Sequence, residues 1–536
     1  MDQKLAYNIL DILQTMLSAV KQMKEQYVAG EMQEFNSLSM DLWEGLTVVK
    51  EIAVQNVSEG SRIRLKDACD CALQSLKDIR LLTITAPEKV DWKLEYELAA
   101  IIETMQIQFF YWSIISKDAS KKKEFQEFLK KTDTFAQLFA SKEKRSYEVE
   151  LSILVTGYNH LDYTVQCVNS ILENCPQNIT TEIIVFNHGS SDGTKKFFES
   201  MSELKVINVA VNGVMPCVTF KAQSRGRYVL FVSNDVIIGK NAIGNLYRSA
   251  KEHRNYGYVV PTTPAVSNLQ TISASYSTKE EFNAFVEKNN IYDEKRHEQR
   301  VRLCNPVHLC ESILWLKFSF ETYEDKYCNI NNFSFPDDKY SLWIRRHGFK
   351  SILAKDAYCH HFGSITLKQD IGREEQQQRF YLEGRKNFQM RYGVDPWGTG
   401  FCYNYELFKD WEIPPIDGAN ILGINCGLGS NSLKVKEVMR EKGAQNVTLY
   451  NVTQEDRFLE DLQGVSDYAF TFSCLNEIGE MTGRREFDYV VVDDPIAGVP
   501  CEKIVQTIEN AGITYKEIAY NNPTDNKWEI YKYQRR

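Results

Sequence analysis

Short apolar segments alternate with amphipathic segments between residue 150 and about residue 240. The apolar segments are "LSILVTGYN", "TEIIVFNHG", "LKVINVAVN" and "RYVLFVSND", and segments such as "DYTVQCVNSILENC" between them have helical spacing. Strands that alternate with helices predict a mostly parallel sheet with helices on both of its faces. This pattern restricts the centre of the chain to an α/β fold.

Polar residues follow three of these predicted strands. They are Thr156, Tyr158 and Asn159 after the first strand, Asn187, His188, Ser190 and Asp192 after the second, and Ser233, Asn234 and Asp235 after the last. In such sheets, ligands bind at the carboxyl ends of the strands. An unpaired buried carboxylate is costly, so Asp235 is expected to have a partner or a chemical role. The alternative is that Asp235 is an ordinary turn residue that ends the strand.

Two further segments flank this central part, as expected for 536 residues, which exceed what one core supports. The first 145 residues place apolar side chains at helical spacing, which predicts four or five antiparallel helices. After the link "DWEIPPIDGAN", the run "NILGINCGLGSNSLKVKEVM" predicts a strand, a glycine loop and a helix. The sequence therefore predicts a multidomain chain with an all-α helical bundle at residues 1–145, a central α/β domain at residues 146–395, a linker at residues 396–414 and a smaller, Rossmann-like α/β domain at residues 415–536.

The composition excludes several classes of protein. The net charge of −9 argues against a nucleic-acid partner, because phosphate contacts need an excess of Lys and Arg. No apolar run approaches the roughly 18 residues that a membrane span needs, and the start "MDQKLAYNIL" has no signal-peptide pattern. The 13 cysteines lack zinc-ligand spacing, which is typical of buried thiols in a reducing compartment. We therefore expect a cytoplasmic chain without a transmembrane segment.

Four motifs, in their order along the chain, resemble those of family 2 glycosyltransferases of the GT-A fold. They are "SILVTGYNHLDYTVQCVNSIL", "IIVFNHGSSDGT", "RGRYVLFVSNDVII" and "FSFPDDKYSLWIRRHGFKSILAKDAYCHHFGS". The resemblance covers roughly residues 150–395. It implies a GT-A domain that transfers a sugar from a nucleotide-diphosphate donor and inverts the anomeric configuration.

The resemblance assigns a metal site to Asp235. A nucleotide-sugar donor leaves as a diphosphate, and a divalent cation neutralises the charge that builds up on it. Mn²⁺ and Mg²⁺ suit oxygen ligands and leave positions open for phosphate. Ser233 stands where the family has a further acid. The resemblance also implies that His360, with His361 beside it, completes the metal or diphosphate site; a structural role at the strand end is the alternative.

Asp337 aligns with the catalytic base of the family, and Asp338 lies beside it. The resemblance implies that this acid deprotonates the acceptor hydroxyl during the displacement. Two adjacent acids that open a helix are also good N-terminal residues for that helix, which is the alternative for both. Lys339 falls where the family often has another acid, and this substitution leaves the acceptor open.

The polar strand ends are implied to bind the nucleotide-sugar donor. The residues are Thr156, Tyr158, Asn159, Asn187, Ser190, Asp192, Ser233, Asn234 and Asp235. Asn187 stands where the family has an acid that contacts the base, and an amide offers a different set of donors and acceptors. We expect a UDP-sugar, with thymidine and guanosine nucleotides as alternatives.

The run "NILGINCGLGSNS" resembles the glycine-rich motif of class I methyltransferases. Gly427 and Gly429 match this motif, whereas Gly423 replaces its acid. The acid expected at the end of the next strand is also replaced, by Asn451 in "TLYNVTQ". The resemblance therefore implies a degenerate methyltransferase-like fold that serves as a scaffold or interaction module. Active methylation is the alternative.

These observations favour a metal-dependent inverting hexosyl- or N-acetylhexosaminyltransferase. The expected acceptor is a bacterial protein, such as flagellin, or a surface glycan, gripped by the helical and C-terminal domains. Two alternatives remain open. One is a sugar-nucleotide-binding pseudoenzyme, which the substitutions Asn187, Ser233 and Lys339 support. The other is a bifunctional glycosyl- and methyltransferase.

Overall fold

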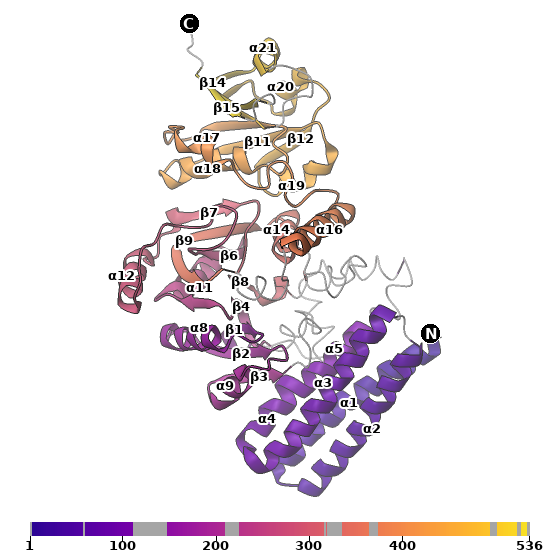
Figure 1. Cartoon of the computed structure of the whole chain (residues 1–536). Coiled ribbons are helices and arrows are strands. Elements are labelled where there is room, and N and C mark those ends of the chain that lie inside the picture. The colour runs from indigo at the N-terminus through magenta and orange to yellow at the C-terminus, as the bar shows by residue number, and fades with distance from the viewer. Residues whose placement is uncertain are drawn as a thin grey trace. The chain divides into compact units, whose positions relative to one another are not determined.

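The structure of the protein is a computed structural model of the whole chain (Figure 1). It describes residues 3–56, 59–110, 120, 147–208, 224–315, 318, 335–363, 374–493, 501–522 and 527–532. The chain divides into two compact units, the first made of Met1–Val236 and Cys310–Lys326 and the second of Ile237–Leu309 and Tyr327–Arg536. Each unit has its own hydrophobic core.

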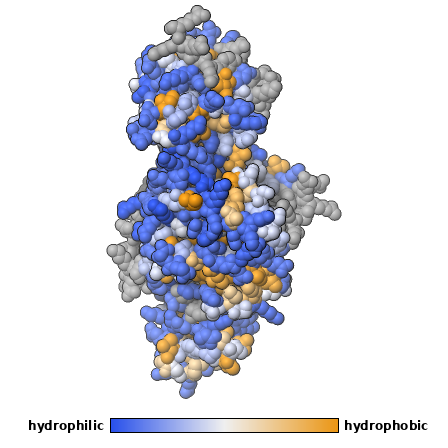
Figure 2. All heavy atoms as spheres, turned by 90° about the vertical axis from the view of Figure 1, so that its left-hand side faces the viewer, coloured by the Kyte–Doolittle hydropathy of each residue, from blue (hydrophilic) through white to orange (hydrophobic). Residues whose placement is uncertain are grey.

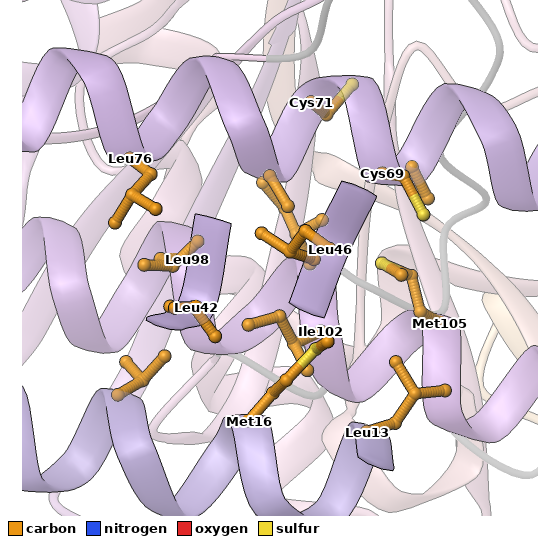
Figure 3. Close-up of a cluster of buried hydrophobic side chains, with 14 of the residues drawn as sticks. Leu13, Met16, Leu42, Leu46, Cys69, Cys71, Leu76, Leu98, Ile102 and Met105 are labelled. Carbon is orange, nitrogen blue, oxygen red and sulfur yellow. The ribbon is translucent and has the colours of Figure 1, made fainter. Parts of the chain in front are cut away.

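The N-terminal part of the first unit is helical, as its apolar spacing predicted. Its elements are α1 (Gln3–Ala29), α2 (Met32–Asn56), α3 (Glu59–Thr85), the 3₁₀ turn η1 (Pro87–Lys89), α4 (Val90–Lys93), the π-helical turn η2 (Leu94–Leu98) and α5 (Ala99–Phe110). Apolar side chains recur every three or four residues, so they share one side of each helix. Figure 3 shows such side chains of several helices in one core, among them Leu13, Met16, Leu46 and Ile102. Residues 111–119 and 121–145 of the predicted helical domain lie outside the described residues.

Four parallel strands form the sheet part of the first unit. In their order across the sheet they are β3 (Leu204–Asn208), β2 (Thr181–Asn187), β1 (Val149–Gly157) and β4 (Gly226–Ser233). Helix α8 (Leu161–Asn174) follows β1, and α9 (Thr194–Ser200) follows β2. The register pairs Thr156 with Ser233 and Gly157 with Asn187, so three strand ends meet at one edge. The predicted alternation of strands and helices is confirmed here.

The helices of the first unit pack against this sheet. One hydrophobic core holds residues of the helices together with sheet residues such as Ile184, Phe186 and Val229. Polar contacts add to this packing. Glu95 of η2 forms an ion pair with Arg225. Through these contacts the helical segment supports the strands that carry the polar residues.

The second unit carries strands in the order β8-β6-β9-β5, with β7 paired to β9. The elements are β5 (Val236–Ile238), α11 (Ala242–Glu252), β6 (Tyr256–Thr262), α12 (Lys279–Asn289), η4 (Glu294–Arg296), β7 (His297–Arg300), β8 (Val307–Glu311), α14 (Pro336–Arg346) and β9 (Lys350–His361). Strand β6 pairs with β9 in parallel, whereas β6 with β8 and β7 with β9 are antiparallel pairs. The sheet is therefore mixed, which is consistent with a GT-A fold.

A second sheet follows in the C-terminal part of the second unit. Its order is β12-β11-β10-β13-β14-β15, and only β15 is antiparallel to its neighbour among the described pairs. The strands are β10 (Asn420–Ile424), β11 (Thr448–Thr453), β12 (Tyr468–Thr471), β13 (Glu486–Val492), β14 (Thr514–Asn522) and β15 (Lys527–Lys532). The helices are α16 (Glu374–Tyr392), α17 (Tyr405–Lys409), α18 (Ser430–Glu441), η5 (Asp456–Phe458), α19 (Leu459–Gln463), η6 (Leu475–Glu477), α20 (Ile478–Met481) and α21 (Cys501–Asn510).

Hydrophilic residues cover most of the face that Figure 2 shows. Within the described part of the chain, none of the helices has the length and hydropathy that a membrane crossing requires. Among the cysteines whose side chains the structure describes, none forms a disulfide and most are buried. They therefore pack as small apolar side chains, as their scattered positions predicted.

Candidate functional site

Polar residues from the ends of β1, β2 and β4 lie together in the first unit. The N–H of Asn159 donates to Ser190 Oγ at 2.9 Å, and the N–H of Ser191 donates to Asn159 Oδ1 at 2.8 Å. Asn234 Nδ2 donates to the carbonyl of Asn159 at 3.2 Å and to Thr164 Oγ1 at 2.9 Å. The structure thus joins the loops after the three strands into one cluster, as the strand-end pattern predicted.

The loop after β1 has an unusual backbone. Asn159 and His160 have φ angles of 54° and 58°, in a region that residues other than glycine seldom adopt. Asparagine tolerates this conformation because its short polar side chain bonds locally. The contacts with Ser190 and Ser191 hold the loop in place. Thr156, near the end of β1, and Tyr158, in the loop that follows, are both half-buried.

Asn187, at the end of β2, is buried and bonded through both atoms of its amide. Its Nδ2 donates to Asn208 Oδ1 at 2.9 Å, and its Oδ1 accepts from the N–H of Ser190 at 3.0 Å. The N–H of Asn208 donates in turn to Glu97 Oε2 of η2 at 3.1 Å. The side chain of Asn187 is therefore fixed in orientation, and each amide atom keeps the capacity for a further bond. Sequence reasoning missed Asn208 and Glu97, because no local motif marks either residue.

The carboxylate of Asp192 accepts three hydrogen bonds although the residue is exposed. The donors are the N–H of Leu161 at 2.9 Å, the N–H of Thr194 at 3.1 Å and Thr194 Oγ1 at 2.7 Å. Partial burial raises the pKa of Asp192, but these hydrogen bonds outweigh it and hold the pKa below its usual value. Because Leu161 and Thr194 are the first residues of α8 and α9, Asp192 fixes the start of both helices. Its contact with a donor remains a prediction.

Asp235 lies between β4 and β5 and is only 7% exposed. Ser233 is half-buried, and its carbonyl oxygen lies 3.5 Å from Cys167 Sγ. Across the described residues, no group of three His, Cys, Asp or Glu side chains is arranged to hold a metal ion. A cation at Asp235 would therefore need phosphate and water oxygens as further ligands, an arrangement that Mg²⁺ favours.

In the second unit, Asp337 and Asp338 lie in the first turn of α14. The N-cap position belongs to Phe335, so neither acid caps this helix. Asp338 is buried and forms an ion pair with Arg302. Asp337 is half-buried and accepts from the N–H of Asn305 at 3.4 Å. The two neighbouring carboxylates thus have different environments, and only Asp338 is paired with Arg302.

The surroundings of Asp337 shift the pKa of its carboxyl. Burial and the neighbouring Asp338 raise the pKa of Asp337 to about 7, whereas the charge of Arg302 acts to lower it. A general base works best when its pKa lies near the operating pH. Sequence reasoning missed Arg302, which lies 36 residues before Asp338 in a run without a motif.

His360 and His361 end β9, and each binds a neighbour through Nδ1. Nδ1 of His361 lies 2.7 Å from the carbonyl oxygen of Ala265, so Nδ1 donates this hydrogen bond. Nδ1 of His360 lies 2.5 Å from Tyr276 Oη. Burial and the neighbouring His361 lower the pKa of His360, which favours a neutral ring. Neutral imidazoles that are oriented through one nitrogen suit metal binding.

Sequence comparison finds a match between the central segment and a known family. Residues 152–310 match the model of glycosyl transferase family 2. An uncharacterised glycosyltransferase of Mycoplasma genitalium is 24% identical over 116 residues, which are 20% of this chain and 39% of that relative. The chain thus spans well under half of the length of this relative. The match covers three of the four motifs and agrees with the glycosyltransferase class that they predicted, whereas the motif with Asp337 lies outside it.

Structure comparison finds partial similarities to sugar-transferring enzymes. GalNAc-T7 with UDP, GalNAc and Mn²⁺ has a TM-score of 0.30 and 12% identity, over 40% of this chain and 44% of that protein. The mannosyltransferase of Pyrobaculum calidifontis with GDP-Man and Mn²⁺ has a TM-score of 0.32 and 13% identity, over 49% of this chain and 71% of that protein. Both TM-scores lie below 0.5, and neither likeness carries an argument about this chain.

Proposed function

We propose that this chain, whose residues 152–310 match the model of glycosyl transferase family 2, transfers a hexosyl or N-acetylhexosaminyl group to a hydroxyl with inversion. The observation that carries this proposal is Asp337, a half-buried carboxyl with a pKa of about 7 where the family has its base. The proposed donor is a UDP-sugar. The proposed acceptor is a bacterial protein, such as flagellin, or a surface glycan.

The donor is proposed to bind at the strand ends of the first unit. Thr156 at the end of β1 and Tyr158 and Asn159 in the loop after it would line the nucleotide, with Ser190, Asp192, Ser233 and Asn234 nearby. Asn187 would face the base. Uracil presents one N–H between two carbonyl oxygens, and an amide can pair with that edge through its oxygen and its N–H. The fixed orientation of the Asn187 amide supports this proposal.

Asp235 is proposed as a residue that would hold Mn²⁺ or Mg²⁺ when the donor diphosphate is bound, and His360 and His361 are proposed as further metal ligands. One carboxylate and a neutral imidazole suit either cation when phosphate oxygens supply the remaining ligands. When bound, the cation would neutralise the charge of the departing diphosphate. The buried position of Asp235 and the neutral state favoured for His360 support this assignment.

Asp337 is proposed to drive the displacement. Its carboxylate takes the proton of the acceptor hydroxyl while that oxygen attacks the anomeric carbon. The bond from this carbon to the diphosphate oxygen breaks, and the electron pair leaves with the diphosphate. Attack from the opposite face inverts the configuration. Asp338 holds Arg302 beside the base, and the charge of Arg302 limits the rise in the pKa of Asp337.

The proposed function is tested by measuring the rate at which the chain releases the nucleoside diphosphate from sugar nucleotides in the presence of Mn²⁺. We expect Asp235→Ala to reduce this rate by about 100-fold or more, because several kcal/mol of charge stabilisation are lost. Asp41→Ala, at an exposed position of α2 in the same unit, should behave as wild type. Wild-type protein that is silent with every sugar nucleotide would contradict the proposal and favour the pseudoenzyme.

Replacing Arg302 with Met should shift the pH dependence of the reaction to higher pH. Arg302 lowers the pKa of Asp337, so its loss lets that pKa rise above about 7. The base is active when deprotonated, and the rate would then reach its plateau at higher pH. Arg302→Lys, which keeps the charge, is the control. The measurement is kcat/KM across neutral pH, and an unchanged profile in Arg302→Met would speak against this role of Arg302.

The C-terminal sheet is proposed to be a degenerate, methyltransferase-like domain that acts as a scaffold. Numbered in chain order from β10, its strands follow the order 3-2-1-4-5-6, which is that of a doubly wound, Rossmann-like sheet. We also propose that the chain consists of a helical domain at residues 1–145, a glycosyltransferase domain at residues 146–395, a linker at residues 396–414 and the C-terminal domain at residues 415–536. A cytoplasmic location is proposed as well.

A further inference from the structure

Residues 397–403 cover the glycine-rich loop between β10 and α18. The N–H of Leu428 donates to the carbonyl of Thr399 at 3.0 Å, and the N–H of Ser430 donates to the carbonyl of Gly400 at 3.1 Å. In α/β domains, the N–H groups of this loop and of the helix start are the ones that receive anionic cofactor groups. Here carbonyl groups of the same chain take them.

The two backbones approach so closely that neither tolerates a side chain at its glycine. A Cβ atom on Gly400 would lie 2.1 Å from the carbonyl oxygen of Cys426, and one on Gly427 would lie 2.1 Å from that of Thr399. Both glycines have positive φ angles, 73° and 55°, which glycine adopts without strain. Gly427, which resembles a cofactor-binding glycine, therefore serves a contact within the chain.

The position that corresponds to a ribose-binding acid is part of the core. Asn451 lies inside β11 rather than at its end, and its side chain is fully buried. Its Oδ1 accepts from Ser432 Oγ at 2.8 Å, and its Nδ2 donates to Ser466 Oγ at 2.7 Å. A Cβ atom on Gly423 would lie 2.0 Å from Asn451 Oδ1, so this glycine makes room for the asparagine. Both departures from the methyltransferase motif thus serve packing.

The covering segment also contacts the residues around the base. The guanidinium carbon of Arg302 lies 5.9 Å from the ring centres of both Trp397 and Phe401, within cation–π range. Arg302 is the partner of Asp338, next to Asp337. One segment therefore joins the glycine-rich loop to the start of α14.

The other end of α14 is held by the C-terminal sheet domain as well. Asp461 of α19 is fully buried and accepts from Arg345 Nε and from Arg346 Nη2, each at 2.6 Å. Both arginines lie in the last turn of α14. One buried carboxylate thus binds two arginines of α14, and this restricts the orientation of the helix. Removing one partner of a buried ion pair is strongly destabilising.

A third contact involves Glu298 of β7, which is 3% exposed. It forms ion pairs with Lys434 of α18 at 2.7 Å, with Arg300 at 2.9 Å and with Lys355 at 3.2 Å. Burial raises the pKa of Glu298, but the three cations outweigh burial and hold it far below its usual value. Glu298 therefore remains charged and ties β7 to α18.

We propose that residues 397–403 are a built-in occupant of the glycine-rich loop, and that the C-terminal domain positions the base helix α14 instead of binding a cofactor there. The inference rests on the proposed function, because it takes Asp337 as the base. Gly400 and Asp461 act as positioning residues. The loop keeps the shape of a cofactor site, and its contacts serve the transfer reaction.

Gly400→Ala tests the positioning role, with Gly418→Ala as its matched control. Gly418 has nearly the same φ angle, 70° against 73°, but a Cβ atom there meets nothing within 4 Å. Gly400→Ala should lower kcat by about 10- to 100-fold, because small misplacements of a catalytic group are costly. It should also shift the apparent pKa of the reaction and leave the KM for the donor unchanged. Equal kcat and pH profiles in the two variants would overturn the proposal.

Asp461→Asn keeps the positioning role testable if Gly400→Ala does not fold. The substitution preserves the shape of the side chain and removes the charge that holds Arg345 and Arg346. It should lower kcat and change the pH profile, again with an unchanged KM for the donor. A variant with wild-type kcat and pH profile would contradict the support of α14 by this domain.

Calorimetry of the full chain with S-adenosylmethionine tests the occupied loop independently. We expect no binding heat, because the N–H groups of Leu428 and Ser430 are already bonded to carbonyls of residues 399 and 400. Saturable binding of one molecule per chain would overturn this part of the proposal. The calorimetric result does not depend on sugar transfer, so failure of the proposed function and failure of the occupied loop are distinguishable.

Discussion

The Asp337→Asn variant should hydrolyse the sugar-nucleotide donor about 100- to 10,000-fold more slowly than the wild-type chain, the range for loss of a general base. An amide has nearly the shape of the carboxylate but cannot accept the proton. The KM for the donor should change little, because the donor is proposed to bind at the strand ends of the first unit. Hydrolysis is the measurement, since water then takes the place of the acceptor.

The kcat/KM of the wild-type chain should depend on pH through the protonation of Asp337. A general base acts in its deprotonated form, and the pKa of Asp337 is raised to about 7. The wild-type kcat/KM should therefore rise through about pH 7 and level off above it. Below that pH, the rate should fall about tenfold per pH unit. Asp337→Asn should lose this dependence together with the rate.

Asp410→Asn is the control for Asp337→Asn. Asp410 is exposed at the end of α17 in the same unit, so its substitution should leave rate and profile unchanged. A wild-type rate that stays constant well below pH 7 would contradict a base with this pKa. An active Asp337→Asn variant would show that another group takes the proton.

The strand ends could be predicted from the sequence because their signals are local. An apolar run followed by polar residues marks a strand and its end, and parallel strands bring such ends to one edge. The contacts within the cluster could not be predicted in the same way. The bond of Asn187 to Asn208 depends on the register between β2 and β3, which side-chain patterns alone do not specify.

The surroundings of the base show a similar limit. The acids of α14 were predicted from a motif, but the ion pair of Asp338 with Arg302 joins two residues that are 36 positions apart. The difference between Asp337 and Asp338 follows from this single contact and from burial. Two adjacent aspartates in a sequence reveal neither the contact with Arg302 nor the burial of each side chain. The proposal of Asp337 as the base therefore needs the fold.

The glycine-rich loop illustrates why a motif can indicate the fold without the ligand. The spacing of Gly427 and Gly429 predicted a strand, a tight loop and a helix, which the structure contains. The groups that cover this loop are backbone carbonyls of Thr399 and Gly400. Backbone carbonyls are present in every residue and leave no signature in the sequence.

The helical segment was predicted from its apolar spacing, but its polar contact with the sheet was not foreseen. Lys93 and Glu97 are four residues apart, a spacing typical of exposed ion pairs on a helix. In the structure their side chains are only 3% and 1% exposed, and Nζ lies 2.9 Å from Oε2. Glu97 belongs to the π-helical turn η2, and such turns often occur at functional sites.

Glu97→Ala is expected to destabilise the first unit by about 3–5 kcal/mol, the cost of leaving one member of a buried ion pair without its partner. The substitution also removes the acceptor for the N–H of Asn208, which orients Asn187. The KM for the donor should therefore rise several-fold. Urea-induced unfolding measures the loss of stability, and hydrogen exchange at β3 should become faster.

The pH dependence and a double variant separate the ion pair from the other effects of Glu97→Ala. Burial lowers the pKa of Lys93, and in the wild type Glu97 outweighs burial. Without Glu97, Lys93 is buried more easily when neutral, so the loss of stability in Glu97→Ala should shrink as pH rises.

Replacing both residues, Lys93 with Met and Glu97 with Leu, should recover part of the lost stability, because apolar pairs often replace buried ion pairs well. Glu287→Ala, which breaks an exposed pair with Lys240, should have little effect. A Glu97→Ala variant as stable as Glu287→Ala would mean that η2 does not hold the end of β3, and hence does not orient Asn187.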